Sequence, residues 1–217
     1  MVQKQYHTEL VNVQQKVLRL SKLANAAIKG SVKALQDHDV EQAEAVIKGD
    51  ARINDLSAEI EVLCMQLPAL QQPVAQDLRM IEALIKVNLD IERISDLAVD
   101  IAKIVAANKD EEYVKPLIDI PLMAHITCEM LDDALCAFGE LNSTLAYDIA
   151  KRDDEIDALF DQLRRVLLTF MVENPEKIEN ASHLTSVAQY LEQIGDHVGN
   201  ICESVVYMVT GDRVKLN

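Results

Sequence analysis

Each half of this 217-residue chain carries, at corresponding places, two pairs in which an acidic residue is followed four positions later by a second carboxylate or an amide. Residues at that spacing face the same way on a helix, with Cβ atoms about 5–6 Å apart. Like charges so placed repel each other, and a bound cation removes the repulsion. The spacing therefore indicates oxygen-ligand metal sites, whose candidate ligands, with two positions one turn further on, are Asp50, Asn54, Glu92, Asp96, Asp100, Asp153, Asp157, Glu192, Asp196 and Asn200.

Oxygen-bearing side chains that converge from two neighbouring helices suit a hard cation such as Fe(III), Mn, Mg or Ca. A helical wheel places the candidate ligands to one side of the apolar seam, so we expect none of the carboxylates to be a core residue. An ordinary solvated acidic face is the alternative interpretation, because acidic pairs at this spacing are common in helices. The occurrence of the pairs on corresponding helices of two repeats favours the metal site.

Other site chemistries find little support in the sequence. A ferritin-type di-iron site needs Glu-x-x-His on inward faces, and this motif does not occur. Phosphate-binding glycine loops and nucleophile elbows are also missing from the sequence, so we expect no enzyme. His197 follows Asp196, but the helical wheel places it away from the row of candidate ligands, called the acidic stripe below. It is therefore interpreted either as a surface histidine or as an accessory ligand.

Composition favours a helical, cytoplasmic protein. The net charge of −15, from 36 acidic and 21 basic residues, repels nucleic-acid backbones and anionic lipids. With 6 glycines, 5 prolines and 4% aromatic residues, the chain has few of the residues that sandwiches and barrels need. We find no signal-peptide core and no apolar run near the ~18 residues of a spanning helix. The cysteines have apolar neighbours and no C-x-x-C spacing, so we expect buried thiols at Cys64, Cys128, Cys136 and Cys202.

Apolar residues recur at steps of three and four along most of the chain, which predicts six helices. The first helix ends before a turn at residues 36–39, where Asp39 can cap the second. The second ends around 68–73 and the third in the polar stretch 108–112. Proline at 116 and 121 suits the start of the fourth, and Asn142 can cap the fifth. The fifth helix carries the seam Ile156, Leu159, Leu163 and Val166 and ends at Asn174–Pro175, before the sixth.

The pattern of the first half returns in the second. Residues 48–54 resemble residues 151–157 at an offset of 103, and residues 92–96 resemble residues 192–196 at an offset of 100. This internal repeat predicts an all-α protein of two tandem three-helix bundles, with domain boundaries at 1–112 and 113–217.

These motifs resemble those of the PhoU family over essentially the whole chain. The shared segments are E-R-I-S-D at 92–96, E-Q-I-G-D at 192–196, Q-P-V-A-Q-D-L-R at 72–79 and V-Y-M-V-T-G at 206–211. Three positions depart from the family pattern: Asn54 replaces an acid, Ser95 a glycine and Gln193 an arginine. Because Asn54 supplies an amide instead of a carboxylate, we expect the second repeat to bind metal more tightly than the first.

The resemblance implies a pair of three-helix bundles with iron clusters, or else Zn, Mn or Mg, on the paired acidic motifs. It also implies a cytoplasmic negative regulator that couples the ATPase of a phosphate ABC transporter to a sensor histidine kinase. Such a regulator reaches the membrane through its partners only, binds no nucleic acid and is compatible with a homodimer. Two alternatives stay open: a metal-buffering or storage protein that uses the same acidic sites, and a metal-free helical scaffold whose acidic face binds a basic partner.

Overall fold

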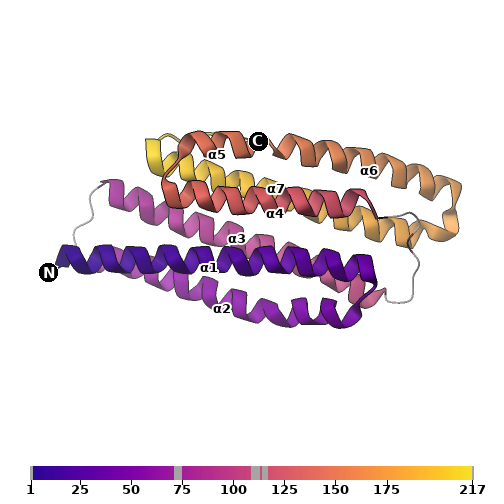
Figure 1. Ribbon diagram of the computed structural model, residues 1–217, viewed down its shortest axis with the longest axis horizontal. Helices are drawn as coiled ribbons and strands as arrows, with labels where there is room; N and C mark the ends of the chain where they lie inside the picture. Colours follow the sequence, from indigo (N-terminus) through magenta and orange to yellow (C-terminus); the bar gives the residue numbers. More distant parts are fainter. Residues whose placement is uncertain (1, 71–74, 109–112, 114–116, 217) are drawn as a thin grey trace.

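The computed structural model describes residues 2–70, 75–108, 113 and 117–216, and the secondary structure of these residues is helical (Figure 1). The first repeat comprises three long helices, α1 (Val2–Asp37), α2 (Val40–Leu70) and α3 (Ala75–Ala107). The second repeat comprises α4 (Asp119–Glu140), α5 (Ser143–Ala150), α6 (Asp153–Glu173), the 3₁₀ turn η1 (Pro175–Lys177) and α7 (Ile178–Thr210). The predicted fold of two repeated helical bundles is confirmed, with one change in the second.

Two of the predicted helix starts carry the side-chain caps that the sequence indicates. Asp39 Oδ1 accepts a hydrogen bond of 2.9 Å from the backbone N–H of Gln42 in the first turn of α2. Asn142 Oδ1 accepts one of 3.0 Å from the N–H of Leu145 in the first turn of α5. Each cap satisfies a donor that the first helical turn leaves unpaired, so the sequence specifies both turns locally.

The expectation of a single fifth helix is wrong, because the structure divides this stretch into α5 and α6. Between them, Arg152 reaches α4 and forms ion pairs of 2.9 Å with both Glu129 and Asp133. Three acidic residues in the first turn of α6 favour a new helix start at this point, because the helix dipole is positive there. The division places Asp153 at the very beginning of α6.

Two smaller expectations about burial are also wrong. Val166, predicted in the apolar seam, is 46% exposed, because α6 packs on the core through Ile156, Leu163 and Leu167. Cys136 is exposed on α4, with its Sγ 3.6 Å from Glu140 Oε1, whereas the other cysteines are buried as expected.

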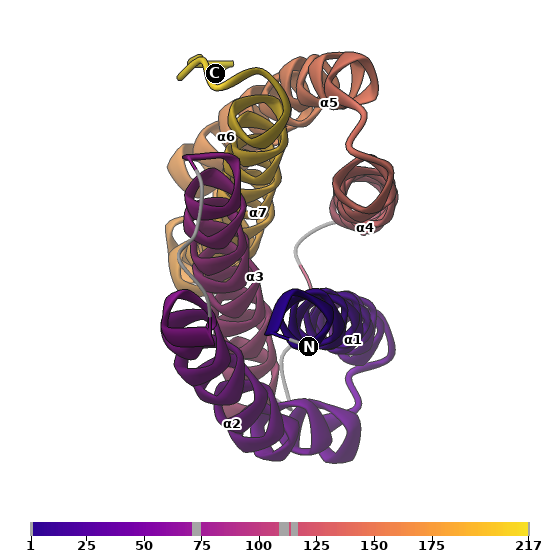
Figure 2. The same cartoon turned by 90° about the vertical axis from the view of Figure 1, so that its left-hand side faces the viewer.

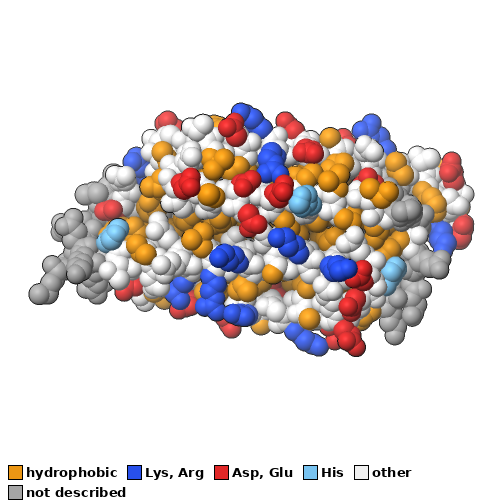
Figure 3. Space-filling view, in the orientation of Figure 1, with side chains coloured by type: hydrophobic (Ala, Val, Ile, Leu, Met, Phe, Trp, Pro, Cys, Tyr) orange, Lys and Arg blue, Asp and Glu red, His pale blue; other side chains and the backbone are white. Residues whose placement is uncertain are grey.

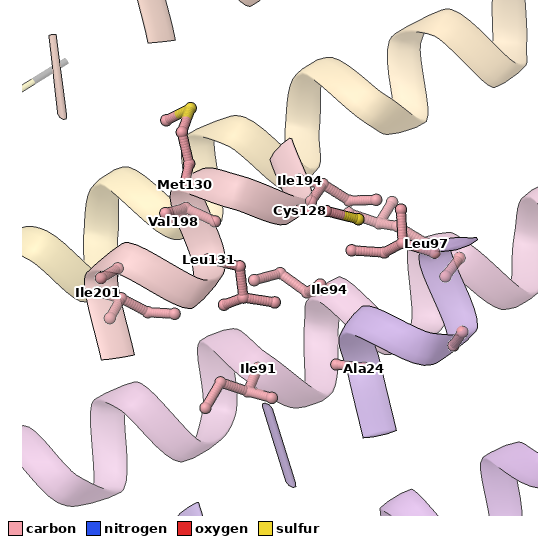
Figure 4. Close-up of a cluster of buried hydrophobic side chains, with 14 of the residues drawn as sticks. Ala24, Ile91, Ile94, Leu97, Cys128, Met130, Leu131, Ile194, Val198 and Ile201 are labelled. Carbon is pink, nitrogen blue, oxygen red and sulfur yellow. The ribbon is translucent and has the colours of Figure 1, made fainter. Parts of the chain in front are cut away.

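The two repeats share one continuous hydrophobic core. Helices α3 and α7 lie side by side through the middle of the molecule, and α1 packs against α4 (Figure 2). Figure 4 shows Ile91 and Ile94 of α3 in one cluster with Ile194 and Ile201 of α7, completed by Leu131 of α4. All five side chains are buried. Two of the helices that carry acidic motifs, α3 and α7, are therefore fixed relative to each other by packing between the repeats.

The surface over α1 and α4 is mixed in charge and polarity. Acidic and basic side chains are interspersed there with hydrophobic ones, without a continuous patch of one charge sign among the described residues (Figure 3). Across the helices that the structure describes, none combines the length and the apolar character needed to span a bilayer.

Candidate metal centres on the two repeats

The acidic residues of the second repeat gather where α6 begins beside α7. Asp153 is the first residue of α6 and is only 5% exposed, whereas Glu192 is half-buried and Asp196 is exposed on α7. The buried Oδ1 of Asp153 has no hydrogen-bond partner. The expectation that no carboxylate is a core residue is therefore wrong for Asp153. An ionised oxygen in such a place needs a proton or a cation to offset its lost hydration.

Gly195 on α7 makes the burial of Asp153 sterically feasible. A Cβ atom at Gly195 would collide with Asp153 Oδ1 and would lie 3.0 Å from Ile156 Cδ1. The missing side chain thus leaves room for the carboxylate against the backbone of α7. Sequence reasoning missed this role, although the exchange of Gly195 for Ser95 between the repeats is the signal that marks it.

Burial and the charges within the cluster raise the pKa values of three of its members. Burial first, and then the charges of Asp157, Asp196 and Glu192, raise the pKa of Asp153 to about 7. Burial and the charge of Asp196 also raise the pKa values of Asp157 and Glu192. The structure therefore brings the four predicted carboxylate ligands of the second repeat within electrostatic reach of one another.

In the first repeat, two of the corresponding carboxylates already accept hydrogen bonds from neutral side chains. Asn54 Nδ2 donates a hydrogen bond of 3.0 Å to Asp50 Oδ2. Ser57 Oγ donates one of 2.6 Å to Glu92 Oε2, and Ser57 itself is held by Asn88 Nδ2 at 2.9 Å. Asp50 Oδ1 remains buried without a partner. Ser57 and Asn88 were not predicted to take part, because neither residue type is a strong ligand by itself.

Two basic side chains neutralise the remainder of the first acidic stripe. Arg93 Nη1 lies 3.5 Å from Asp96 Oδ2, and Lys103 Nζ lies 2.8 Å from Asp100 Oδ1. The hydrogen bond to Asp100 raises the pKa of Lys103, and the charges of Asp100, Asp50 and Asp96 act in the same direction against the effect of burial. Lys103 is thus within electrostatic reach of three acids of its repeat.

The second repeat has no counterpart of these cations. At the repeat offset of 100, Gln193 stands in place of Arg93 and Glu203 in place of Lys103. Arg152 precedes Asp153 in the sequence, but its guanidinium is bound to α4. Among the described residues, no ion pair reaches the four carboxylates of the second cluster.

Asn200, also a candidate ligand, is engaged on the first repeat instead. Its Nδ2 donates a hydrogen bond of 3.2 Å to Asp90 Oδ1 on α3, and His197 Nδ1 lies 2.9 Å from the same oxygen. The interpretation of His197 as a plain surface histidine is therefore wrong, because the ring bridges α3 and α7.

The oxygen-rich donor set of the second repeat fits a hard cation. Among the described residues, no three acidic, imidazole or thiol side chains stand ready as placed to hold one ion. Asp157 and Asp196 are exposed, however, so rotation of their side chains toward Asp153 does not disturb the core. The buried carboxylate of Asp153, which lies against Gly195 with Oδ1 unpartnered, supplies the fixed side of such a site.

Comparison with known proteins finds the same domain in both repeats. A model of the PhoU domain matches residues 17–105 and 120–205. The chain is 37% identical over 218 residues, 100% of both chains, to the phosphate-specific transport system accessory protein PhoU homolog of Clostridium acetobutylicum. It is 39% identical over 207 residues to the homolog of Aquifex aeolicus, which covers 95% of this chain and 94% of that relative.

Two solved structures extend the similarity to the fold. The crystal structure of PhoU from Pseudomonas aeruginosa matches with a TM-score of 0.91 and 31% identity, over 95% of this chain and 100% of that one. The crystal structure of the phosphate transport system regulatory protein PhoU from Streptococcus pneumoniae gives 0.90 and 31%, over 96% and 99%. By its two domain matches, its full-length relatives and its fold, this chain belongs to the PhoU family.

Proposed function

We propose that this protein is an accessory regulator of a phosphate transport system. The observation that carries the proposal is similarity over both repeats to relatives named as accessory proteins of the phosphate-specific transport system. Because the match covers these relatives almost completely, it concerns their whole architecture and not one module.

In finer terms, the protein acts as a negative regulator that couples the transporter ATPase to a sensor histidine kinase in the cytoplasm. It reaches the membrane through these partners, binds no nucleic acid and performs no catalysis of its own. The net charge of −15 supports this mode of action, since such a charge repels lipid and nucleic-acid phosphates and attracts basic protein surfaces.

The metal part of the proposal concerns the second repeat first. Asp153, Asp157, Glu192 and Asp196 hold a hard cation, iron by the family resemblance, with Mn, Mg or Zn as alternatives. The cation supplies positive charge where the carboxylates repel one another. Asp153 anchors the site from α6, Glu192 and Asp196 close it from α7, and the joint between these helices is stiffened as a result.

A gene deletion tests the regulatory proposal. In cells grown with ample phosphate, loss of the protein should derepress a reporter fused to a phosphate-starvation promoter. A reporter that stays as low as in wild type, with no paralogue covering the loss, would contradict regulation and leave metal buffering or a metal-free scaffold as the function.

Substitutions then connect regulation with the acidic cluster. Glu192→Ala with Asp196→Ala should reproduce part of the derepression, provided that circular dichroism shows a folded protein. Glu176→Ala with Glu179→Ala removes the same charge from exposed positions in η1 and in the first turn of α7 and serves as the matched control. Equal reporter levels in the two double variants would assign the effect to net charge and exclude a role of the site.

A further inference from the structure

We infer that Lys103 is the built-in counter-ion of the first repeat, so that only the second repeat binds a metal ion tightly. The inference rests on the metal part of the proposed function and narrows it to one repeat. In a symmetric assignment, by contrast, the acidic stripes of both repeats would bind metal equally.

The ammonium group of Lys103 pairs with an acid at the end of the first acidic stripe. Its Nζ is 2.8 Å from Asp100 Oδ1, on the same face of α3 and one turn further along. The charges of Asp50 and Asp96 also act on this group, although both belong to the predicted metal ligands. A tethered cation of this kind repels an incoming metal ion and reduces the attraction of the carboxylates for it.

The neutral contacts of the first repeat close the remaining ligand positions. The 2.6 Å hydrogen bond from Ser57 holds Glu92 Oε2 and restricts the movement of this carboxylate toward a metal ion. At the repeat offsets, Phe160 and Ala188 replace Ser57 and Asn88, so the second repeat lacks this hydrogen-bonded group.

The second repeat lacks the lysine and the hydrogen-bonded serine of the first. Glu203 stands at the position of Lys103, and its Oε1 accepts a 2.8 Å hydrogen bond from the backbone N–H of Leu216. Each repeat has one buried carboxylate oxygen without a partner, Asp50 Oδ1 and Asp153 Oδ1, but Asp153 is only 5% exposed whereas Asp50 is half-buried. The two stripes therefore share the positions of their acids but not their need for an added cation.

Titration with Mn²⁺ alone tests the inference on the metal-free, full-length protein. Isothermal titration calorimetry and the electron paramagnetic resonance signal of free Mn²⁺ report affinity and stoichiometry. Glu192→Gln with Asp196→Asn silences the second repeat while preserving side-chain size. In that background, Lys103→Met should increase Mn²⁺ affinity by about tenfold, because it removes the adjacent positive charge.

The matched control in the same background is Lys33→Met on α1. Lys33 is also exposed and also pairs with an acid of its own helix, Asp37 at 2.6 Å, so the change in net charge is identical. This variant should leave Mn²⁺ affinity within about twofold, since an exposed distant charge is screened. Circular dichroism should show unchanged helix content in every variant.

The outcomes separate the inference from the proposed function. If wild type binds no Mn²⁺ but Lys103→Met does, the site assigned to the second repeat fails, and Lys103 stands as the counter-ion that keeps metal out of the first. If the silenced protein binds as tightly as wild type and Lys103→Met acts no more than Lys33→Met, the inference is wrong while metal binding stands. Absence of binding in every variant overturns both.

Discussion

Asp50 and Asp153 occupy equivalent positions in the two repeats, but their surroundings differ. Asp50 is half-buried and accepts a hydrogen bond from Asn54, within a stripe that also contains Lys103. Asp153 is 5% exposed, lies against Gly195, and is surrounded by carboxylates that raise its pKa to about 7. In the first repeat basic side chains pair with Asp96 and Asp100, although Asp50 Oδ1 has no partner, whereas among the described residues no ion pair reaches the four carboxylates of the second.

This difference in electrostatic surroundings shows that two repeats with the same fold can differ in their capacity to bind a cation. The first stripe resembles an ordinary stabilised surface, in which each carboxylate has a nearby donor or cation. The second violates local electrostatic consistency inside a well-packed bundle, and such violations concentrate at functional sites. The two repeats thus share a backbone arrangement, and their side chains give the two acidic clusters different electrostatic surroundings.

The largest effect that sharpens this comparison is expected from Gly195→Ala. The added Cβ collides with Asp153 Oδ1 and crowds Ile156, so the free energy of unfolding should fall by about 1–3 kcal/mol. Thermal denaturation should show a Tm lower by a few degrees. Mn²⁺ affinity should fall as well, because Asp153 is displaced.

The matched variant in the first repeat is Ser95→Ala. Ser95 is fully buried and its Oγ has no hydrogen-bond partner, so loss of the hydroxyl should change the Tm little. Equal destabilisation by Gly195→Ala and Ser95→Ala would contradict the special role of the space at Gly195.

Metal removal is the next test. The apolar core forms without the acids of the second stripe apart from Asp153, so chelation should leave the helical circular dichroism unchanged. Saturating Mn²⁺ should raise the Tm, with a free energy of about 2.7 kcal/mol at a hundredfold excess over the Kd. Loss of helix on chelation would contradict the separation of fold and metal, because the protein would then behave like a zinc finger.

The pH dependence of the metal-free protein is expected to be smaller. The pKa of Asp153 is raised from 3.8 to about 7, so in this window the folded carboxyl holds a proton that the unfolded one releases. The free energy of unfolding should therefore fall as pH rises from 5 to 8, by about 1–2 kcal/mol after allowance for solvent screening.

Asp153→Asn should flatten this dependence, and bound Mn²⁺ should flatten it in the wild type. Urea denaturation at pH 5 and pH 8 measures the difference. The raised pKa values of Asp157 and Glu192 act in the same direction, so some slope should remain in the variant. Parallel slopes in wild type and variant would exclude Asp153 as a main source.

The smallest expected effect comes from exchanging the ligand that differs between the repeats. Asp157→Asn should weaken Mn²⁺ binding about fivefold, because one exposed carboxylate near the ion is lost. Asn54→Asp should strengthen binding much less, since Lys103 still compensates the first stripe. A larger gain from Asn54→Asp than loss from Asp157→Asn, measured by calorimetry, would show that ligand count and not the counter-ion separates the repeats.

The fold could be predicted from sequence because its signals are local. Apolar steps of three and four, the caps at Asp39 and Asn142, and the repeat offsets all act within one helix or one turn. The division between α5 and α6 could not, because it depends on Arg152 reaching two acids on α4.

The candidate site was only partly predictable. Spacing identified the acids of both repeats, but a helical wheel treats Asp153 as lying off the core. Its burial depends on the contact of α6 with Gly195 of a helix that follows it in sequence. The engagement of Asn200 by Asp90 likewise arises from packing of α3 against α7, which no single-helix pattern contains.

Anomalous diffraction from crystals of the full-length protein grown with Mn²⁺ tests the central claim most directly. The account predicts an anomalous peak between α6 and α7, within coordination distance of Asp153 and the carboxylates of Glu192 and Asp196. It predicts no peak beside Asp50, Glu92 and Asp96. Peaks of equal occupancy on both repeats, or a peak on the first repeat alone, would contradict it.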